Sequence, residues 1–500
     1  MTETPTDIRA VADSAVALVD RFKQALARRD RTALNEIIRQ LLNEAPVLGP
    51  HWKSIAATSR ELGELEDALN AMRLYARDFG EDPAVRYEVA AVTAQSGFVE
   101  RAAAIINDIP VQIPTPAANA YIRGTLLTNR GKFTAARAVL RDAVRLDPAS
   151  GQAWLALAMV GNVEPEDSKT IIDALKTMES AADFERAAHC YAVGKVCHER
   201  GQFTKAFEFF SRGAALVQRS RPYNFAEDRQ SATEAVEGWS SARILEMHTR
   251  LAAEARAAGK SPPESSAIFV TGLPRSGTTL VEQILVSHSG VDDGDELGLF
   301  RIIEAEVRGR SWSAFSRWLK SGGSVLALAE LYNHLVRQRF PGSQKVVDKS
   351  LGAGRYLGLL LSMFPNAKVV WVRRDPFDCA WSAYRTWFLR GLSWSWSLES
   401  IARHFRLEDE LFNFWTRQCP DRILVVEYEK LVKSPESEIA RLNTFCGLQT
   451  EPLQLQPHKK ERSVTTASVS QVRQPINPTA LGASLPYRQW MTPFARLYQP

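Results

Sequence analysis

The chain has 500 residues, 62 Lys and Arg against 57 Asp and Glu, and a hydrophobic share of 45%. This length exceeds what one hydrophobic core organises, so we expect two or more domains, and the composition excludes a disordered or fibrous protein. The net charge of +5 is too small to indicate nucleic-acid binding by itself. The sequence has no long apolar run, no signal-like start and five scattered cysteines, so it predicts a soluble cytoplasmic protein with free thiols and no membrane span.

The first part of the chain carries a repeat. Gly63, Gly97 and Gly131 are spaced 34 residues apart, and Gly201 follows at close to two further periods. Five residues after each glycine stands an alanine, and seven residues before each stands another small residue. Small side chains at these places let two antiparallel helices pack closely, while the glycine closes the turn between them. The unit between Gly131 and Gly201 is degenerate, because Gly-Asn-Val-Glu-Pro replaces its central turn.

This pattern resembles the tetratricopeptide repeat (TPR), which has a period of 34 residues. The resemblance implies an all-α solenoid over residues 1–220, whose concave groove binds a peptide or a partner protein. The segment before about residue 30 is expected to be one more poor copy or a capping helix. The alternative is a generic helical bundle in which the glycine spacing is accidental.

A linker and a different kind of domain follow the repeats. Residues 221–262 are first polar, then helical, and end at a Pro-Pro pair flanked by serines, which is typical of a boundary. Beyond it, short apolar runs alternate with amphipathic stretches, which predicts an α/β domain with a mostly parallel sheet over residues 263–500. The runs expected to form strands are residues 267–271, 345–347, 367–372 and 423–427.

Residues 272–279, Gly-Leu-Pro-Arg-Ser-Gly-Thr-Thr, join a predicted strand to a predicted helix. The backbone N–H groups of such a loop, together with the helix N-terminus, form a concave anion site. Its glycine spacing matches the phosphate loop of nucleotide-binding enzymes, but Thr278 stands where the Walker lysine belongs. A triphosphate with bound magnesium is therefore a poor ligand. One arginine and three hydroxyls suit a less charged anion.

The loop resembles the 5′-phosphosulfate loop of the sulfotransferases, which bind 3′-phosphoadenosine-5′-phosphosulfate (PAPS), and it is most similar to the tyrosylprotein branch. The resemblance extends over about residues 265–480. It implies a P-loop-like parallel sheet and PAPS as sulfonate donor, with no metal. The loop residues that it assigns to the nucleotide are Gly272, Arg275, Ser276, Gly277, Thr278 and Thr279.

A second phosphate site is expected after the strand that ends at Val372. Asp375 is suited to cap the following helix and Pro376 to occupy its first turn. Arg374 and Ser382, eight residues apart, would then converge on a dianionic phosphate. This order resembles the 3′-phosphate site of the family. Taken alone, the charged run Arg373-Arg374-Asp375 would indicate only a solvent-exposed strand end.

The resemblance also implies catalytic residues. A glutamate stands 21 residues after the loop arginine in the tyrosylprotein enzymes, which is the place of Glu296 here. Glu296 is therefore the expected general base, with Asp295 as its nearest rival and a solvated acidic turn as the alternative. Lys349 resembles the lysine that stabilises the leaving group together with Arg275, although an ordinary exposed lysine is the alternative.

Three further segments complete the expected site. Tyr428 resembles the tyrosine at a strand end that contacts the nucleotide. Residues 466–476 resemble the flap that closes over PAPS, with Ser468 and Arg473 as expected ligands. The tyrosylprotein enzymes carry a lysine where Gln474 stands, so either Arg473 or Gln474 could be the flap residue that contacts the nucleotide. The aromatic residues between 381 and 396 are expected to pack a helix against the sheet, with an acceptor pocket as the alternative.

The resemblance therefore predicts a PAPS-dependent sulfotransferase whose acceptor is a protein or peptide tyrosine docked by the repeats. Alternative acceptors are glycan, lipid or small-molecule hydroxyls. Two other functions remain open, a P-loop kinase and a TPR scaffold with an inactive nucleotide fold. A metal site and a nucleic-acid partner are not expected. The sequence leaves the acceptor, the TPR partner and the oligomeric state open, a homodimer included.

Overall fold

A computed structural model describes residues 5–80, 82–294, 296–342, 344–388, 392–464 and 469–499, without the side chains of residues 5–14 and 293. The chain forms two compact units, Met1–Asn119 with His334–Pro341, and Ala120–Asn333 with Gly342–Pro500. This division does not bear on the domain boundaries expected at residues 220 and 262, which stay predictions. Within the described ranges, no helix combines the length and the apolar character that a membrane span needs.

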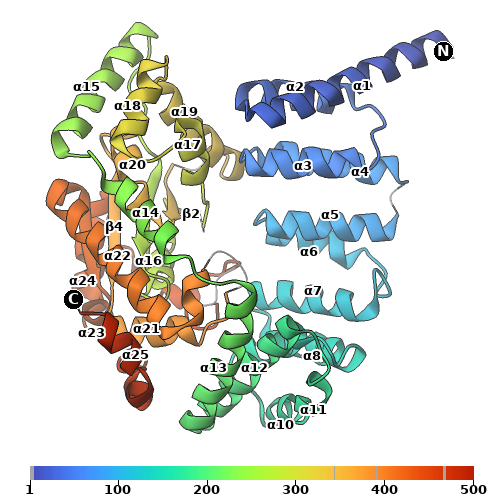
Figure 1. The fold of residues 1–500 in the computed structure, drawn as a ribbon, viewed down its shortest axis with the longest axis vertical. Coiled ribbons are helices and arrows are strands. Elements are labelled where there is room, and N and C mark those ends of the chain that lie inside the picture. Colours follow the sequence, from blue (N-terminus) through green and yellow to red (C-terminus); the bar gives the residue numbers. More distant parts are fainter. Residues whose placement is uncertain are drawn as a thin grey trace. The chain divides into compact units, whose positions relative to one another are not determined.

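The first unit consists of paired helices (Figure 1). Helix α3 packs on α4 and α5 on α6, and the pairs turn at Gly63 and Gly97, whose φ angles are +80° and +85°. Only glycine adopts this left-handed backbone without strain, which explains the repeated glycine of the sequence. The helices are α1 (Pro5–Arg28), α2 (Arg31–Glu44), α3 (His51–Glu61), α4 (Leu65–Asp78), α5 (Pro83–Gln95) and α6 (Val99–Asn107).

The repeats continue in the second unit. Its glycine turns, Gly131 and Gly201, again have positive φ, +73° and +70°. A Cβ atom on Gly124 would lie 2.4 Å from Leu140 Cγ, and one on Gly194 would lie 2.8 Å from Phe210 Cδ1. The predicted small residues thus allow helices to pack closely. The helices are α7 (Pro116–Asn129), α8 (Phe133–Leu146), α9 (Gly151–Met159), α10 (Pro165–Asp173), α11 (Leu175–Met178), α12 (Asp183–Glu199) and α13 (Phe203–Ser220).

Two helices occupy the segment between repeats and sheet. Helix α15 (Ser241–Ala257) matches the predicted helix, whereas α14 (Phe225–Val236) lies in the stretch for which the sequence indicated only a polar character. The apolar pattern of α14 is weak because its buried residues are the small Ala232 and Ala235. Its Asp228 is anchored by Arg355, at 2.8 Å. Tertiary contacts therefore stabilise a helix that lacks a strong apolar stripe.

In the described part of the chain, the sheet has five parallel strands in the order β2-β3-β1-β4-β5. The four predicted strands are confirmed, and the two-residue β2 is too short to leave a pattern in the sequence. Strand β1 lies between β3 and β4, so the loop that follows β1 leaves the sheet near its middle. The strands are β1 (Ala267–Gly272), β2 (Asp292–Asp293), β3 (Val346–Lys349), β4 (Lys368–Arg373) and β5 (Ile423–Glu427).

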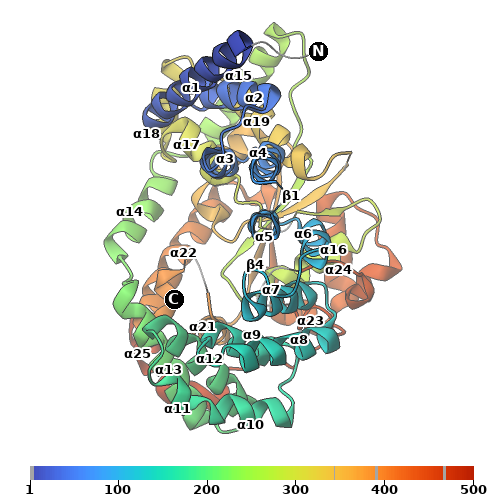
Figure 2. The same ribbon diagram turned by 90° about the vertical axis from the view of Figure 1, so that its right-hand side faces the viewer.

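Helices cover both faces of this sheet, as Figure 2 also shows from the side. On one face, Val270 and Val370 pack in a core with α16 and α24. On the other, Phe269 meets Phe300 and Tyr332. The helices are α16 (Thr278–Val286), α17 (Phe300–Val307), α18 (Trp312–Lys320), α19 (Val325–Arg339), α20 (Leu357–Met363), α21 (Pro376–Tyr384), α22 (Leu398–Gln418), α23 (Tyr428–Lys433), α24 (Pro435–Cys446) and α25 (Thr492–Leu497).

The aromatic residues of the segment 381–396 lie in a hydrophobic core, as expected, but they pack against repeat helices. Trp381 is fully buried and stacks on Tyr487, with ring centroids 3.6 Å apart. Phe210 of α13 meets the edge of the same indole. The hydroxyl of Tyr191 on α12 donates to the carbonyl of Tyr384 on α21, at 3.0 Å. One continuous core therefore joins helices α12 and α13 to the α/β part.

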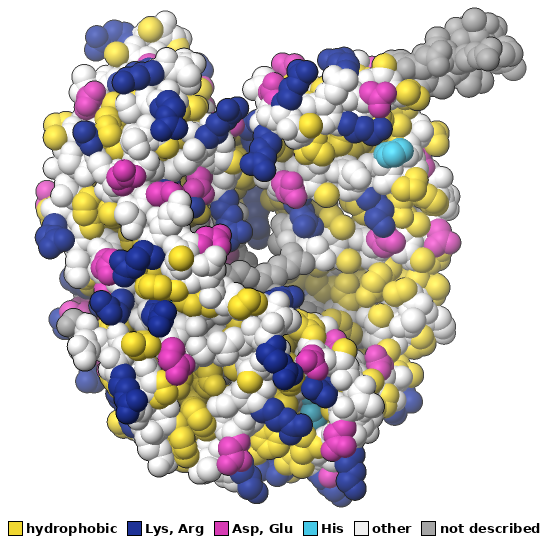
Figure 3. Space-filling model, in the orientation of Figure 1, with side chains coloured by type: hydrophobic (Ala, Val, Ile, Leu, Met, Phe, Trp, Pro, Cys, Tyr) yellow, Lys and Arg dark blue, Asp and Glu magenta, His cyan; other side chains and the backbone are white. Residues whose placement is uncertain are grey.

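The surface in Figure 3 carries basic and acidic side chains intermixed over the visible face. This agrees with the small net charge of +5. All five cysteines are buried and unpaired.

Candidate functional site

The loop between β1 and α16 is built on unusual backbone. Arg275 has a φ of +72°, a conformation that few residues other than glycine adopt, and Gly277 has a φ of +106° directly before α16. A Cβ atom on Gly277 would lie 2.4 Å from Cδ2 of Tyr428, so the ring of that tyrosine packs directly on the loop. Thr278 and Thr279 are the buried first residues of α16. The helix N-terminus therefore faces the loop, as an anion site requires.

Two predicted phosphate ligands meet the loop arginine. Arg275 donates from Nε to Oγ of Ser382, at 3.0 Å. Arg374 donates from Nη1 to the carbonyl of Arg275, at 3.1 Å, and its guanidinium lies over the ring of Tyr428, 4.8 Å from the centroid. Asp375 caps α21 by accepting from the backbone N–H of Asp378, at 2.9 Å, which orients the helix that carries Ser382. The structure thus joins Arg275, Arg374, Ser382 and Tyr428 around one loop.

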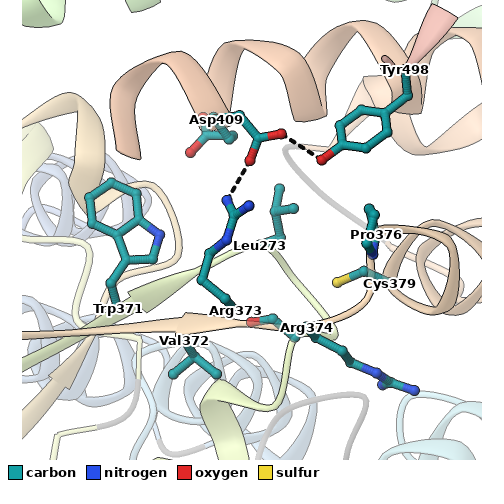
Figure 4. A pocket seen from close by; sticks show the side chains of 11 residues that line it. Leu273, Trp371, Val372, Arg373, Arg374, Pro376, Cys379, Asp409 and Tyr498 are labelled. Atoms are coloured by element: carbon teal, nitrogen blue, oxygen red, sulfur yellow. Dashed lines mark hydrogen bonds and ion pairs between the residues drawn. The ribbon is translucent and has the colours of Figure 1, made fainter. Parts of the chain in front are cut away.

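The two arginines at the end of β4 have different surroundings. Arg373 is paired with Asp409, which also accepts a hydrogen bond of 2.6 Å from the hydroxyl of Tyr498. Figure 4 shows this trio above the strand, while Arg374 extends away from it. Arg373, Asp409 and Tyr498 line a small pocket together with Trp371, Leu273 and other residues of the strand end. The family resemblance selected Arg374 of the two arginines, and alternation along the strand gives their side chains different directions.

The site concentrates positive charge. Burial lowers the pKa of Arg275 to about 10, and repulsion from Arg385 and then Arg374 adds to this effect. The side chain of Arg374 is only 7% exposed. Within the described residues, Oγ of Ser276 and Nε of Arg374 are buried without a hydrogen-bond partner. Buried donors of this kind are costly unless a ligand satisfies them, and a phosphate group has the oxygens to do so.

The candidate catalytic residues meet on the other side of β1. Lys349 pairs in register with Val270 of β1, and its side chain is fully buried. Its Nζ lies 3.0 Å from Oε2 of Glu282 on α16 and 3.6 Å from Oε1 of Glu296. Half of the Glu296 side chain is exposed, at 49%, so an incoming hydroxyl can reach its carboxylate. The structure thus brings the expected lysine and the expected base together.

The described part of the flap contacts both the loop and a repeat turn. Gln471 accepts a hydrogen bond of 2.8 Å from Arg275, so this segment touches the loop. Arg473 instead donates to the carbonyls of Asn129, at 3.1 Å, and Arg462, at 2.8 Å. Its guanidinium rests on Gly131, where a Cβ atom would lie 2.4 Å from Cζ. Arg473 is therefore placed on the turn between α7 and α8.

Several site residues were missed by sequence reasoning. Glu282 holds Lys349 and also accepts from Arg462, at 3.1 Å. A glutamate among apolar residues of α16 was a usable signal, because buried charges are normally paired. Arg462 and Arg385 left no comparable signal. The rival base Asp295 and the expected ligand Ser468 lie outside the described residues. Within the described part of the chain, no group of His, Cys, Asp and Glu is arranged to hold a metal ion.

Comparison with known proteins gives two family matches. The profile of the "Sulfotransferase family" matches residues 267–452. The profile of the "Tetratricopeptide repeat" matches residues 117–160. The sequence-based fold class, repeat helices followed by a sulfotransferase-like parallel sheet, is thereby confirmed.

Among curated proteins, an "Uncharacterized protein" of Aquifex aeolicus (strain VF5) is 29% identical over 397 residues, 75% of this chain and 49% of that protein. A "Putative protein-tyrosine sulfotransferase" of Caenorhabditis briggsae is 27% identical over 227 residues, 43% of this chain and 79% of that protein. The "Protein-tyrosine sulfotransferase" of Drosophila melanogaster is 26% identical over 44% of this chain and 46% of that protein. The chain thus spans about half the length of the Aquifex and Drosophila relatives.

Among solved structures, the "Sulfotransferase Domain from the Curacin Biosynthetic Pathway" is 20% identical, with a TM-score of 0.30 over 48% of this chain and 93% of that one. The "Sulfotransferase Domain from the Synechococcus PCC 7002 Olefin Synthase" is 22% identical, with a TM-score of 0.31 over 47% of this chain and 98% of that one.

Proposed function

We propose that this chain, whose residues 267–452 match the sulfotransferase family profile, transfers the sulfonate of PAPS to an acceptor hydroxyl. The observation that carries the proposal is the joining of Arg275, Arg374, Ser382 and Tyr428 around the loop after the central strand. The buried donors Ser276 Oγ and Arg374 Nε fit the phosphate oxygens of the nucleotide. The other loop residues expected to bind it are Gly272, Gly277, Thr278 and Thr279.

The catalytic roles follow from chemistry and exposure. When bound, PAPS supplies a sulfonate already activated for transfer. Glu296 accepts the proton of the acceptor hydroxyl, so that the acceptor oxygen forms the new bond to sulfur as the bond from sulfur to the phosphate oxygen breaks. Lys349 and Arg275 stabilise the negative charge that develops on that leaving oxygen. The ion pair of Lys349 with Glu282 keeps the ammonium in place for this role.

We propose a protein or peptide tyrosine as the acceptor. Two of the relatives are named as protein-tyrosine sulfotransferases, and the repeats that precede the domain are of a kind that binds polypeptides. A docked polypeptide would present its tyrosine to the half-exposed Glu296. The five unpaired cysteines support placing the protein in the reducing cytoplasm. A glycan, lipid or small-molecule hydroxyl is the competing acceptor.

The deciding experiment is calorimetric titration of the full chain with 3′-phosphoadenosine-5′-phosphate, the product nucleotide. We expect binding without any metal, and weak or no binding of ATP with magnesium, because Thr278 replaces the Walker lysine. A preference for ATP with magnesium would establish a kinase-like protein instead. Binding of neither ligand would leave a repeat scaffold with an inactive nucleotide fold. Transfer of labelled sulfonate to a tyrosine peptide, against a phenylalanine peptide as control, then tests the acceptor.

A further inference from the structure

A histidine of the repeat helices contacts an arginine that follows the helix of a candidate phosphate ligand. Nε2 of His198, near the end of α12, lies 2.8 Å from Nη1 of Arg385. Nδ1 of the same ring lies 2.7 Å from the hydroxyl oxygen of Tyr487. Arg385 directly follows α21, the helix that carries Ser382. The contact therefore connects a repeat helix to the candidate phosphate site.

The protonation of His198 follows from its two partners. Arginine donates hydrogen bonds and does not accept them, so Nε2 of His198 is the acceptor and carries no proton. Nδ1 is then protonated and donates to the hydroxyl of Tyr487. Burial, and secondly repulsion from Arg385, lower the pKa of His198 to about 4, so the ring is neutral near pH 7. The histidine fixes the position of Arg385 without neutralising its charge.

Across the described residues Arg385 forms no ion pair, although Asp378 and Glu199 attract its charge. Asp378 already pairs with Arg374, at 3.7 Å, and accepts from the N–H and hydroxyl of Ser484, at 2.9 and 2.7 Å. Glu199 is already paired with Lys195. The charge of Arg385 is therefore left for another anion.

Three arginines share this region. After burial, repulsion from Arg385 lowers the pKa of Arg275 most, ahead of repulsion from Arg374. Like charges gathered in a partly buried place destabilise the fold unless an anion joins them. The partnerless Nε of Arg374 and Oγ of Ser276 independently indicate an absent acceptor. A phosphate group meets both requirements, because it is anionic and has several acceptor oxygens.

We propose that Arg385 is a further phosphate-binding arginine of the nucleotide site and that His198 is the residue that positions it. The repeat helix α12 is then a part of the nucleotide site as well as of the repeat array. This inference rests on the proposed function, because the phosphate in question belongs to the bisphosphate nucleotide.

The test uses the full chain and two probes. The variants are Arg385→Gln, His198→Phe and His198→Gln, with Arg219→Gln on the exposed surface of α13 as a control for loss of one charge. Calorimetry measures affinity for 3′-phosphoadenosine-5′-phosphate, and thermal unfolding measures the stabilisation by inorganic phosphate. We expect Arg385→Gln to lose roughly tenfold or more in bisphosphate affinity. Its melting temperature without phosphate should equal or exceed that of the wild type, because repulsion is relieved.

The histidine variants separate positioning from packing. His198→Phe fills the space but offers no acceptor, so its bisphosphate affinity should fall towards that of Arg385→Gln. His198→Gln offers an amide oxygen and should recover much of the loss. Equal affinities for His198→Phe and His198→Gln would overturn the positioning role.

The phosphate-binding role of Arg385 is decided by the following outcomes. Unchanged bisphosphate affinity in Arg385→Gln overturns the inference, and so does a lower melting temperature with an unchanged response to phosphate, which marks a structural arginine. A wild type that responds to inorganic phosphate through Arg385 but does not bind the bisphosphate would overturn the proposed function and uphold the anion site. No response of the wild type to either probe would overturn both.

Discussion

Arg373 and Arg374 are neighbours in the sequence, but their guanidinium groups serve different parts of the protein. Arg373 pairs with Asp409 on α22 (Figure 4), whereas Arg374 donates to the carbonyl of Arg275 in the loop. Each arginine is therefore the control for the other, since both substitutions remove one positive charge from the same strand end.

Arg374→Ala should weaken binding of 3′-phosphoadenosine-5′-phosphate by about ten- to a hundredfold, the usual effect of losing a hydrogen bond to a charged group. Turnover at saturating PAPS should change less than affinity. Arg373→Ala should instead lower the melting temperature, because it leaves Asp409 without its cation, and should keep nucleotide affinity. Calorimetry and thermal unfolding of both variants check this. Equal losses of affinity would contradict the assignment.

Lys349→Ala should lower turnover much more than affinity for PAPS, because the lysine is assigned to the leaving oxygen in the transition state. Steady-state kinetics with varied PAPS separate the two quantities. If Lys349 serves only as a buried ion-pair partner, the variant loses stability while the enzyme that remains folded keeps its turnover. Kinetics are therefore normalised to the folded fraction.

Glu296→Gln should mainly lower turnover, whereas Glu282→Gln should mainly lower the free energy of unfolding. The Glu296 side chain is half-exposed, so its substitution should change stability by less than about 1 kcal/mol and lower turnover by roughly 10²- to 10⁴-fold. Glu282 is fully buried between Lys349 and Arg462, so its substitution should cost about 3–5 kcal/mol of unfolding free energy. Urea unfolding and turnover assays measure both. A stable Glu282→Gln protein would show that its ion pairs contribute little.

Gly131→Ala and Gly201→Ala test the packing contact between Arg473 and Gly131. Both glycines have a left-handed backbone, which costs alanine about 1–2 kcal/mol. A Cβ atom on Gly131 would also collide with the guanidinium of Arg473, whereas nothing lies within 4 Å of one on Gly201. Gly131→Ala should therefore destabilise more and should also weaken nucleotide binding, since it displaces the segment that contains Gln471. If Gly131→Ala and Gly201→Ala change stability and nucleotide affinity equally, the contact between the Gly131 turn and Arg473 does not support the flap.

Stability should fall as the pH drops from about 6.5 towards 4. Burial lowers the pKa of His189 to about 4 from the usual 6.5, and His198 has the same shift. In this window the unfolded chain binds protons that the folded chain does not, so the free energy of unfolding decreases with falling pH, by at most about 1.4 kcal/mol per pH unit for each histidine. Above pH 6.5 these groups contribute no slope.

Urea unfolding at pH 7.5, 5.5 and 4.5 measures this dependence. In the wild type, the ring of His189 is hydrogen-bonded to the carbonyl of Ile171, at 2.8 Å, and the amide of His189→Gln can donate to the same carbonyl. The variant should therefore reduce the pH slope of the unfolding free energy by the contribution of about one proton. An unchanged slope would assign the acid sensitivity to other groups.

The sequence by itself determined the features that depend on local backbone and spacing. The turn glycines of the repeats, the four longer strands and the loop of residues 272–279 follow from short-range rules, because positive φ, alternation and close helix packing each demand particular residues nearby. The capping of α21 by Asp375 is of the same kind. The proximity of Glu296 to Lys349 was expected only through the family resemblance, since 53 residues separate them in the sequence.

Only the tertiary structure decided which distant charges meet. Apart from the family resemblance, no feature of the sequence separates Arg374 from Arg373, and none indicates that Arg473 rests on Gly131 or that His198 holds Arg385. Long polar side chains reach several ångströms in many rotamers, so their partners depend on how separate elements pack rather than on sequence spacing. Burial then makes those pairings energetically important, because a charge removed from water requires a partner or a ligand.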